Sequence, residues 1–302
     1  MLNSLKHYIY KKFFESEWGI AWRKNSLDDF PFKDDKSAYK PLPNSEDYWF
    51  ADPMLIEWKD QIYLFAEAYS RRDNCGCICR FLYNGEGFSD FKIIIKNSYH
   101  MSYPFVFEYS GDMYMIPETK QNHSIDLYKA TVFPDRWRKE KTLVSDFNAA
   151  DTTVISVSDS WKLLTYVDGD VESKLQIYNI DLEEKAVVLE TEIVDANKAL
   201  RPAGKFVAHN GELFRPSQQC KQRYGGGLCI NRVTSTWPYS EQIIKEITPM
   251  DIALTDRRII KGIHTYSYAA GIEVVDVLYG KKTDSLLNLY TKYMVNDTRK
   301  PR

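Results

Sequence analysis

Acidic side chains recur beside short apolar segments in this sequence, where they could support acid–base chemistry. Asp52 opens the apolar run of FADPMLIEW, and Glu67 follows the next run, YLFAE. Glu118 ends MYMIPE, and Asp151 stands in AADTTVI. A carboxylate beside apolar strands must be solvated, hydrogen-bonded or paired, and clustered carboxylates push acid and base pKa values apart. We therefore expect Asp52, Asp151 and Glu118 to be catalytic and Glu67 to bind substrate, although each could instead cap a turn or accept backbone N–H groups.

Basic side chains gather in a later part of the chain. Arg201 and Lys205 lie in RPAGK, and Arg215 lies in FRPSQQCKQRYGGG. An arginine beside proline is held rigidly, and two such guanidinium groups could bind a phosphate or carboxylate bidentately. We expect Arg201 and Arg215 to form a phosphate clamp. The same region supplies further predicted substrate-binding residues, which are Lys205, Gln218, Gln219 and Tyr224.

Two histidines and a tyrosine complete the predicted substrate-binding set. His100 lies in SYHMSYP, Tyr103 follows it closely, and His264 lies in GIHTY. Either histidine could bind a hydroxyl group or act as a general base, and a structural role stays open for both. The G-x-S-x-G and H-E-x-x-H motifs are absent, and no GK[ST] follows the three glycines 225–227, so this is not a Walker phosphate loop.

The elements that would position these residues recur along the chain. Each repeat has a polar start, an apolar strand, a turn and a second apolar strand, and the starts are spaced by 51, 48, 50 and 63 residues at Asp52, Tyr103, Asp151, Arg201 and His264. A period near fifty residues is typical of propeller blades of about four strands. We predict an all-β, five-bladed β-propeller over residues 48–296, preceded by a helical or irregular arm (1–47) and followed by a charged tail (297–302). In a propeller the first strand of each blade lines the central channel, so the variable polar starts would converge on one site.

Composition narrows the class of partner. Lys+Arg 40 against Asp+Glu 42 gives a net charge of −2, which argues against nucleic acid. No apolar stretch reaches the roughly 18 residues of a membrane span, and the N-terminus has no signal-peptide core, so we expect a cytoplasmic protein. Residues 1–25 could form a basic, aromatic amphipathic helix that touches the inner face of a membrane or packs on its own domain.

The five cysteines fit a reducing compartment. Cys75, Cys77 and Cys79 alternate along one predicted strand, which is not the C-x-x-C spacing of a zinc site. No metal site is therefore predicted from the cysteines, while a divalent cation remains possible as a cofactor.

Several segments taken together resemble a known family. They are FADPMLI, HMSYPFVFEYSGDMYMIPET, LYKATVFPDRW, ADTTVI, RPAGKFV, LFRPSQQC with YGGGL, and GIHTYS. The set, over roughly residues 48 to 280, is similar to the domain at the N-terminus of glucosamine inositolphosphorylceramide transferases and in stand-alone bacterial proteins of surface-polysaccharide clusters. The resemblance implies a five-bladed β-propeller related to furanosidase-type glycosidases such as arabinanases and β-xylosidases.

Those glycosidases use a base in the first blade, a pKa-tuning Asp in the third and a general acid Glu in the fourth. The resemblance therefore implies Asp52 as the base and Asp151 as the tuning residue. The fourth repeat departs from the pattern, because it offers Arg201 and Arg215 where an acid is expected.

Three functions follow from this comparison of residues. The first is a glycosyltransferase of cell-surface polysaccharide (O-antigen or capsule) synthesis, with a nucleotide-sugar donor and a glycan or lipid-linked acceptor; its base is Asp52 or Asp151, and its leaving phosphate needs cations but no acid. The second is a glycoside hydrolase that uses Asp52, Asp151 and Glu118. The third is a non-catalytic glycan-binding propeller.

Overall fold

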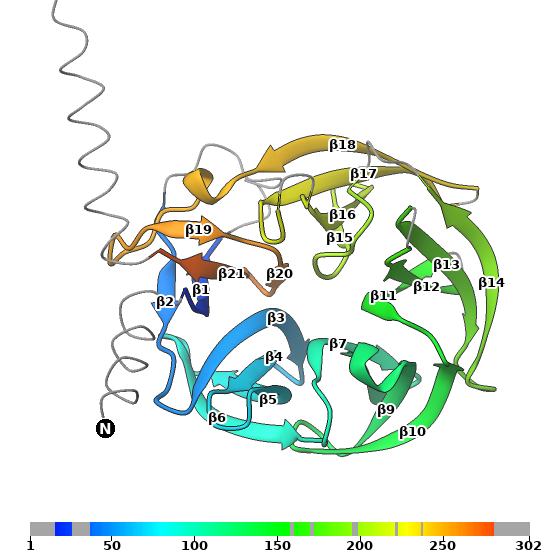
Figure 1. Ribbon diagram of the computed structural model, residues 1–302, viewed down its shortest axis with the longest axis horizontal. Coiled ribbons are helices and arrows are strands. Elements are labelled where there is room, and N and C mark those ends of the chain that lie inside the picture. The colour runs from blue at the N-terminus through cyan, green and yellow to red at the C-terminus, as the bar shows by residue number, and fades with distance from the viewer. Residues whose placement is uncertain are drawn as a thin grey trace, which may run out of the picture.

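Five antiparallel sheets are arranged in a ring around a common centre in the computed structural model (Figure 1). The structure describes residues 16–25, 37–157, 160–169, 172–194, 199–220, 223–236 and 238–280. No α-helix occurs in these ranges, which hold only two 3-10 turns, η2 (Lys120–Asn122) and η3 (Pro249–Asp251). The predicted all-β, five-bladed propeller is therefore confirmed, and the described residues contain no helix that could cross a membrane.

The first four blades each contain four strands in sequence order. Blade 1 holds β3 (Tyr48–Trp58), β4 (Gln61–Ser70), β5 (Cys75–Tyr83) and β6 (Phe88–Ile95). Blade 2 holds β7 (Ser102–Tyr109), β8 (Asp112–Thr119), β9 (Ser124–Val132) and β10 (Arg136–Ser145). Blade 3 holds β11 (Ala149–Val157), β12 (Ser160–Val167), β13 (Lys174–Asp181) and β14 (Ala186–Ile193). Blade 4 holds β15 (Val207–His209), β16 (Glu212–Gln218), β17 (Leu228–Thr236) and β18 (Tyr239–Ile247).

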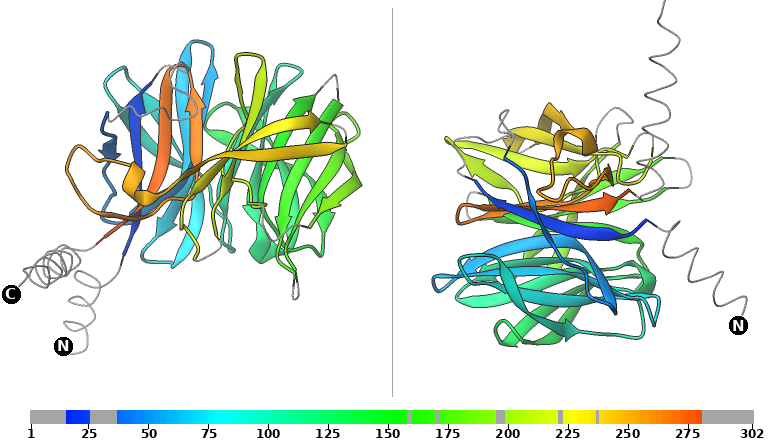
Figure 2. Two further views of the ribbon diagram at one scale, coloured as in Figure 1. Left: turned by 90° about the horizontal axis from the view of Figure 1, so that it is seen from above. Right: turned by 90° about the vertical axis from the view of Figure 1, so that its left-hand side faces the viewer.

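Blade 5 combines strands from both ends of the described chain (Figure 2). It contains β19 (Ile260–Gly262), β20 (Tyr266–Ala269), β21 (Ile272–Tyr279), β1 (Trp18–Lys24) and β2 (Lys40–Leu42). Strand β1 pairs with β21 along its whole length, from Trp18 opposite Leu278 to Lys24 opposite Ile272. This pairing closes the ring and removes the exposed edge that β21 would otherwise present.

The N-terminal segment predicted as an arm therefore contributes to the ring itself. Residues 18–24 and 40–42 are strands rather than helical or irregular structure. Ile20, Ala21 and Trp22 are buried in β1, because they pack between blades once the strand has joined β21. Residues 1–15, most of the predicted amphipathic helix, and the tail 297–302 lie outside the described residues.

The innermost strands of blades 1 to 3 share one local distortion. Asp52, Tyr103 and Asp151 have φ values of 51°, 44° and 52°, and each lies at a shift in the register between the first two strands of its blade. A non-glycine residue in the left-handed region is strained, and a bulge redirects the side chain that it carries. The distortion occurs at equivalent positions of three repeats, which supports the alignment of the repeats. It also turns the backbone at these residues toward the hub.

The inner segment of blade 4 approaches the hub too closely to carry a side chain at Gly204. Gly204 has a φ of 132°, and a Cβ atom there would lie 1.8 Å from the carbonyl oxygen of Tyr266. Its N–H donates to the Tyr103 hydroxyl at 2.6 Å, and the Tyr266 N–H donates to the Ala203 carbonyl at 2.7 Å. These contacts join blades 2, 4 and 5 at the centre of the ring.

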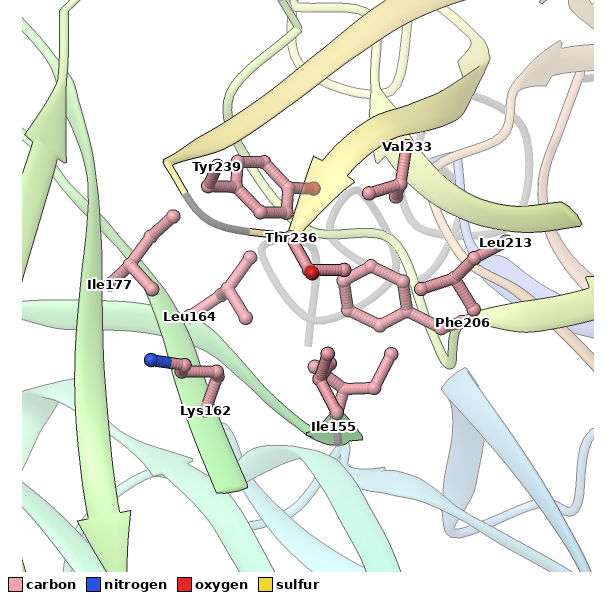
Figure 3. A pocket seen from close by; sticks show the side chains of 10 residues that line it. Ile155, Lys162, Leu164, Ile177, Phe206, Leu213, Val233, Thr236 and Tyr239 are labelled. Atoms are coloured by element: carbon pink, nitrogen blue, oxygen red, sulfur yellow. The ribbon is translucent and has the colours of Figure 1, made fainter. Parts of the chain in front are cut away.

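An apolar pocket lies between blades 3 and 4 (Figure 3). Its lining includes Ile155 and Leu164 from blade 3 and Phe206, Leu213 and Tyr239 from blade 4. None of the predicted site residues lines it, so the chemistry must be sought at the hub.

Candidate functional site

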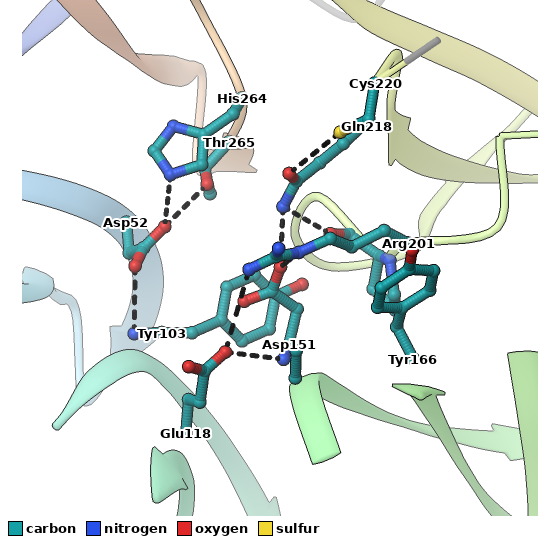
Figure 4. Close-up of polar contacts among 12 residues, drawn as sticks. Asp52, Tyr103, Glu118, Asp151, Tyr166, Arg201, Gln218, Cys220, His264 and Thr265 are labelled. Carbon is teal, nitrogen blue, oxygen red and sulfur yellow. Dashed lines mark hydrogen bonds and ion pairs between the residues drawn. The ribbon is translucent and has the colours of Figure 1, made fainter. Parts of the chain in front are cut away.

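Asp52 lies buried at the hub (Figure 4). Its Oδ2 accepts the Tyr103 N–H at 3.1 Å, and its Oδ1 accepts the Thr265 hydroxyl at 2.9 Å and lies 3.2 Å from His264 Nε2. Burial alone would raise the pKa of Asp52, but the positive charge of His264 and the hydrogen bonds outweigh it and lower that pKa. Asp52 is therefore a stable negative charge in a buried place.

His264 lies between two carboxylates in blade 5. Its Nε2 faces Asp52 and its Nδ1 lies 2.7 Å from Asp276 Oδ2, while Asp276 also accepts the backbone N–H of His264 at 2.9 Å. Burial lowers the pKa of His264, but Asp276 and Asp52 together raise it well above the ordinary value. The geometry fits an imidazolium that fixes both carboxylates.

Asp52, His264 and Asp276 also form a possible set of metal ligands, because their donor atoms lie within 4.8 Å of one another. A metal-bound imidazole must present an unprotonated nitrogen to the ion. Here the ring nitrogens lie 3.2 Å from Asp52 Oδ1 and 2.7 Å from Asp276 Oδ2, so a protonated His264 forms ion pairs with both carboxylates, and His264 would have to lose a proton to bind an ion.

Asp151 forms a second charged group with blade 4. Arg201 Nε donates to Asp151 Oδ2 at 2.5 Å, and Gln218 Nε2 donates to the same oxygen at 2.6 Å. Burial raises the pKa of Asp151, while Arg201 offsets part of that rise. Arg201 keeps 20% of its side chain exposed, so the guanidinium still has a face toward solvent.

Glu118 differs from these aspartates in its protonation. Its Oε2 accepts the Asp151 N–H at 3.2 Å and lies 3.8 Å from Arg201 Nη2, and Figure 4 shows its carboxyl group turned toward that pair. Burial and the neighbouring Asp151 raise the pKa of Glu118 to about 8. At neutral pH Glu118 is therefore mostly a protonated acid beside the ionised Asp52, and this difference suits acid–base chemistry.

Glu67 and His100 lie together beside this cluster. His100 Nε2 is 3.5 Å from Glu67 Oε1, and the ring nitrogen Nδ1 accepts the Gly76 N–H at 3.0 Å. Burial, and next the charge of Asp52, raise the pKa of Glu67 well above its usual range, whereas burial lowers the pKa of His100. Burial therefore favours the neutral form of both groups.

Aromatic rings flank the charged hub. The Tyr224 ring centroid lies 5.0 Å from that of His264, and the Trp18 centroid lies 4.2 Å from His264. Arg201 Cζ is 5.2 Å from the centre of the Tyr224 ring and 5.7 Å from that of Tyr166. Tyr224 is half exposed, so it provides a flat surface on which the apolar face of a sugar could stack.

Arg215 is not part of the site, and its predicted role in a phosphate clamp is wrong. It is fully buried and donates to Glu241 at 2.7 and 2.5 Å and to the carbonyl oxygens of Ala199 and Leu200. Side chains alternate across a strand, so Arg215 and Gln218 on β16 point to opposite faces. Only Gln218 reaches the hub.

Three other predicted ligands also have different surroundings from those expected. The Tyr103 side chain is fully buried and its hydroxyl lies 2.9 Å from Thr153 Oγ1, so it supports the hub from inside and only its N–H reaches Asp52. Lys205 Nζ lies 5.8 Å from the centre of the Phe105 ring and has no ion-pair partner in the described ranges, and burial lowers its pKa to about 7. Gln219 bonds within blade 4, through its N–H to the Gly227 carbonyl at 2.8 Å.

Two functional positions escaped the sequence-based prediction. Asp276, in the apolar run VVDVL, is fully buried, and an acidic residue inside such a run is itself a signal of a buried partner. Trp18 lies in the segment predicted as an arm, and only the pairing of β1 with β21 brings it to His264.

Comparison with known proteins identifies a matching family and two related plant proteins. The family described as "Glucosamine inositolphosphorylceramide transferase 1, N-terminal" matches residues 43–266. Glucosamine inositolphosphorylceramide transferase 1 of Oryza sativa subsp. indica is 30% identical over 193 residues, and that of Arabidopsis thaliana is 26% identical over 195 residues. The matches cover 61% of this chain but only 26% and 25% of those proteins, so the chain spans about a quarter of their length.

Solved structures of glycoside hydrolases share the fold. The catalytic domain of the Coprinopsis cinerea GH62 alpha-L-arabinofuranosidase has a TM-score of 0.60 at 13% identity, over 86% of this chain and 97% of that one. An endo-1,4-beta-xylanase from Bacteroides thetaiotaomicron has a TM-score of 0.55 at 13% identity, over 73% and 80% of the two chains. Because the family match covers most of the sequence, this chain belongs to the family of glucosamine inositolphosphorylceramide transferase 1 N-terminal domains.

Proposed function

We propose that this chain is a carbohydrate-active enzyme that transfers a glycosyl group from an activated donor to a hydroxyl acceptor. The observation that carries the proposal is the ionised Asp52 at the same hub as Arg201, whose side chain is 20% exposed and can face a leaving phosphate. A transferase name in the family and a carbohydrate-cleaving fold among the solved structures support it.

In the proposed reaction the bond between the anomeric carbon and the leaving oxygen breaks as the acceptor oxygen attacks. Asp52 takes the proton of the acceptor hydroxyl and stabilises the positive charge that develops on the sugar ring. The leaving oxygen keeps the bonding electron pair, and Arg201 stabilises its charge; Glu118 supplies a proton where the leaving group is too basic to depart as an anion. With Arg215 internal, Arg201 acts without the second arginine first expected.

The finer part of the proposal concerns the biological setting. A nucleotide-sugar donor, a glycan or lipid-linked acceptor, and a role in O-antigen or capsule synthesis at the cytoplasmic face of a bacterial membrane all fit the family resemblance. The aromatic rings of Trp18 and Tyr224, which lie beside His264, could stack on the sugar part of such substrates.

A glycoside hydrolase is the second candidate, and the raised pKa of Glu118 favours it specifically. Hydrolysis needs an acid that stays protonated beside a carboxylate, and Glu118 and Asp52 provide that pair. The fourth blade contributes Arg201 and Gln218 to the cluster, so a hydrolase would have to take its acid from blade 2.

One experiment separates the two candidates. The purified protein is incubated with a panel of nucleotide-sugars plus neutral oligosaccharides, and in parallel with 4-nitrophenyl furanosides and xylosides. We expect a sugar to be added to an acceptor with release of the nucleotide, and Glu118→Gln to reduce this only modestly because a phosphate leaving group needs no acid. If the protein releases nitrophenol, Glu118→Gln does not, and no sugar transfer is detected, the transferase proposal is contradicted and the hydrolase is supported.

A further inference from the structure

Arg201 presents an unused edge of its guanidinium group at the hub. Its Nε donates to Asp151 Oδ2 at 2.5 Å, whereas its Nη2 lies 3.8 Å from Glu118 Oε2, beyond hydrogen-bond distance. Neither Nη nitrogen donates a hydrogen bond to a residue of the described ranges, and 20% of the side chain is exposed. A guanidinium group binds phosphate through two parallel N–H groups. The Nη edge of Arg201 is therefore available to an anionic ligand.

Two tyrosine rings lie beside this guanidinium group. Arg201 Cζ is 5.2 Å from the centre of the Tyr224 ring and 5.7 Å from that of the Tyr166 ring. The Tyr166 hydroxyl donates to Ser173 Oγ at 2.8 Å, which fixes its ring on blade 3. Because Arg201 is anchored through Nε and lies between neighbouring rings, it loses little side-chain freedom when a ligand binds.

A second cation lies on the rim of the hub. Lys120 Nζ is 2.5 Å from Asp168 Oδ2, and this ion pair joins blade 2 to blade 3. Lys120 follows the last residue of β8, and Asp168 follows the last residue of β12. The side chains are 36% and 52% exposed. Exposed ion pairs contribute little to stability, so Lys120 can exchange Asp168 for another anion with only a small loss of free energy.

Asp168 is stabilised as an anion by both cations. Burial would raise the pKa of Asp168, but Lys120, Tyr166 and the positive charge of Arg201 together lower it. The carboxylate therefore lies where the positive potentials of Lys120 and Arg201 overlap. An anionic oxygen atom of a ligand would be stabilised in the same place, for the same electrostatic reason.

We propose that Arg201 and Lys120 form a diphosphate site on the rim of the hub, and that Asp168 occupies part of this site until the ligand binds. One phosphate group binds the Nη edge of Arg201, and the other binds Lys120 after the Asp168 side chain has moved away. Lys120 thereby supplies the second positive charge that the internal Arg215 does not. The ligand class is a nucleoside diphosphate that carries a sugar. Its assignment as donor rests on the proposed function, whereas the binding of a diphosphate group does not.

Binding is tested by isothermal titration calorimetry of the full chain with inorganic diphosphate and, separately, with orthophosphate, at constant ionic strength. We expect diphosphate, which reaches both cations, to bind roughly tenfold more tightly than orthophosphate, and Lys120→Met to remove most of this advantage. Asp168→Asn should strengthen diphosphate binding about two- to fivefold, because no carboxylate then competes for Lys120. An ion pair that only stabilises the fold would not give these opposite effects.

The matched control is another ion pair of blade 2, between Lys129 and Asp112. Its Nζ and Oδ2 atoms are 2.6 Å apart, and Asp112 is the first residue of β8, at the opposite end of the strand from Lys120. Lys129→Met and Asp112→Asn remove the same charges and should leave the affinity for diphosphate unchanged. Thermal unfolding of all four variants confirms that they are folded.

Three results would overturn the site: equal affinity for the two anions, equal losses in Lys120→Met and Lys129→Met, or weaker diphosphate binding by Asp168→Asn. The site and the transferase can fail separately. If diphosphate binding depends on Lys120 but the unmutated protein transfers no sugar, the site stands and the transferase is contradicted. If Lys120→Met transfers sugar with an unchanged KM for the donor, the transferase stands and the site is contradicted.

Discussion

Replacement of Arg215 by methionine should lower the stability of the folded protein strongly, without changing the site at the hub directly. Arg215 is 0% exposed and forms two hydrogen bonds with Glu241, which is itself almost completely buried. Removal of one partner of a buried ion pair costs about 3–5 kcal/mol, because the other charge is left without compensation. Against a total stability of roughly 5–15 kcal/mol, this is a large fraction.

The assay is urea denaturation at pH 7, followed by tryptophan fluorescence and circular dichroism. We expect the free energy of unfolding of Arg215→Met to fall by about 3–5 kcal/mol, and the melting temperature by roughly 10 °C. The double variant Arg215→Met/Glu241→Leu should recover much of the loss, since two apolar side chains of similar volume can replace a buried pair. A single variant of undiminished stability that has lost affinity for nucleotide-sugars would refute this reasoning and restore the two-arginine clamp.

Three further outcomes follow from the hub. If the reaction is a hydrolysis with Glu118 as the acid, kcat/KM falls as pH rises through about 8, and Glu118→Gln lowers the rate by roughly 10²–10⁴ and removes that limb of the profile; transfer from a nucleotide-sugar should instead keep most of its rate in Glu118→Gln. Folding raises the pKa of Glu118, so the free energy of unfolding should fall as pH rises from the pKa of Glu118 in the unfolded state to about 8. Glu118→Gln should therefore be more stable than the unmutated protein at pH 9 but not at pH 4, as measured by thermal unfolding. Gly204→Ala should prevent folding or lower the melting temperature sharply, since its Cβ would lie 1.8 Å from the Tyr266 carbonyl oxygen; a variant with an unchanged melting curve would show that the hub is looser than described.

The sequence predicted the ring of blades because apolar hairpins recur at nearly constant spacing. The same spacing placed Asp52, Asp151, Arg201 and His264 at repeat-related positions, and the structure brings these four together around one hub. A repeating apolar pattern specifies strands and their order, and propeller geometry then fixes where their first residues meet.

Other features could not be predicted because they depend on partners distant in the chain. Arg201 and Arg215 both stand beside proline in similar contexts, and only the face of β16 decides that Arg215 points inward to Glu241. Nothing local in WGIAWRK shows that this segment pairs with β21. The left-handed backbone of Asp52 and Asp151, which are aspartates rather than glycines, is likewise set by the register between strands and not by residue type.

The central claim is that Asp52 acts as the carboxylate of a glycosyl-transfer reaction. Its most direct test is a mass-spectrometric assay that compares the unmutated protein with Asp52→Asn, which keeps the size and the Thr265 contact but removes the negative charge. With a nucleotide-sugar donor and a neutral oligosaccharide acceptor, we predict a product heavier by one sugar unit, formed at least about 100-fold more slowly by Asp52→Asn. Equal product formation by the two proteins, or no product from any donor with the unmutated protein, would contradict the account.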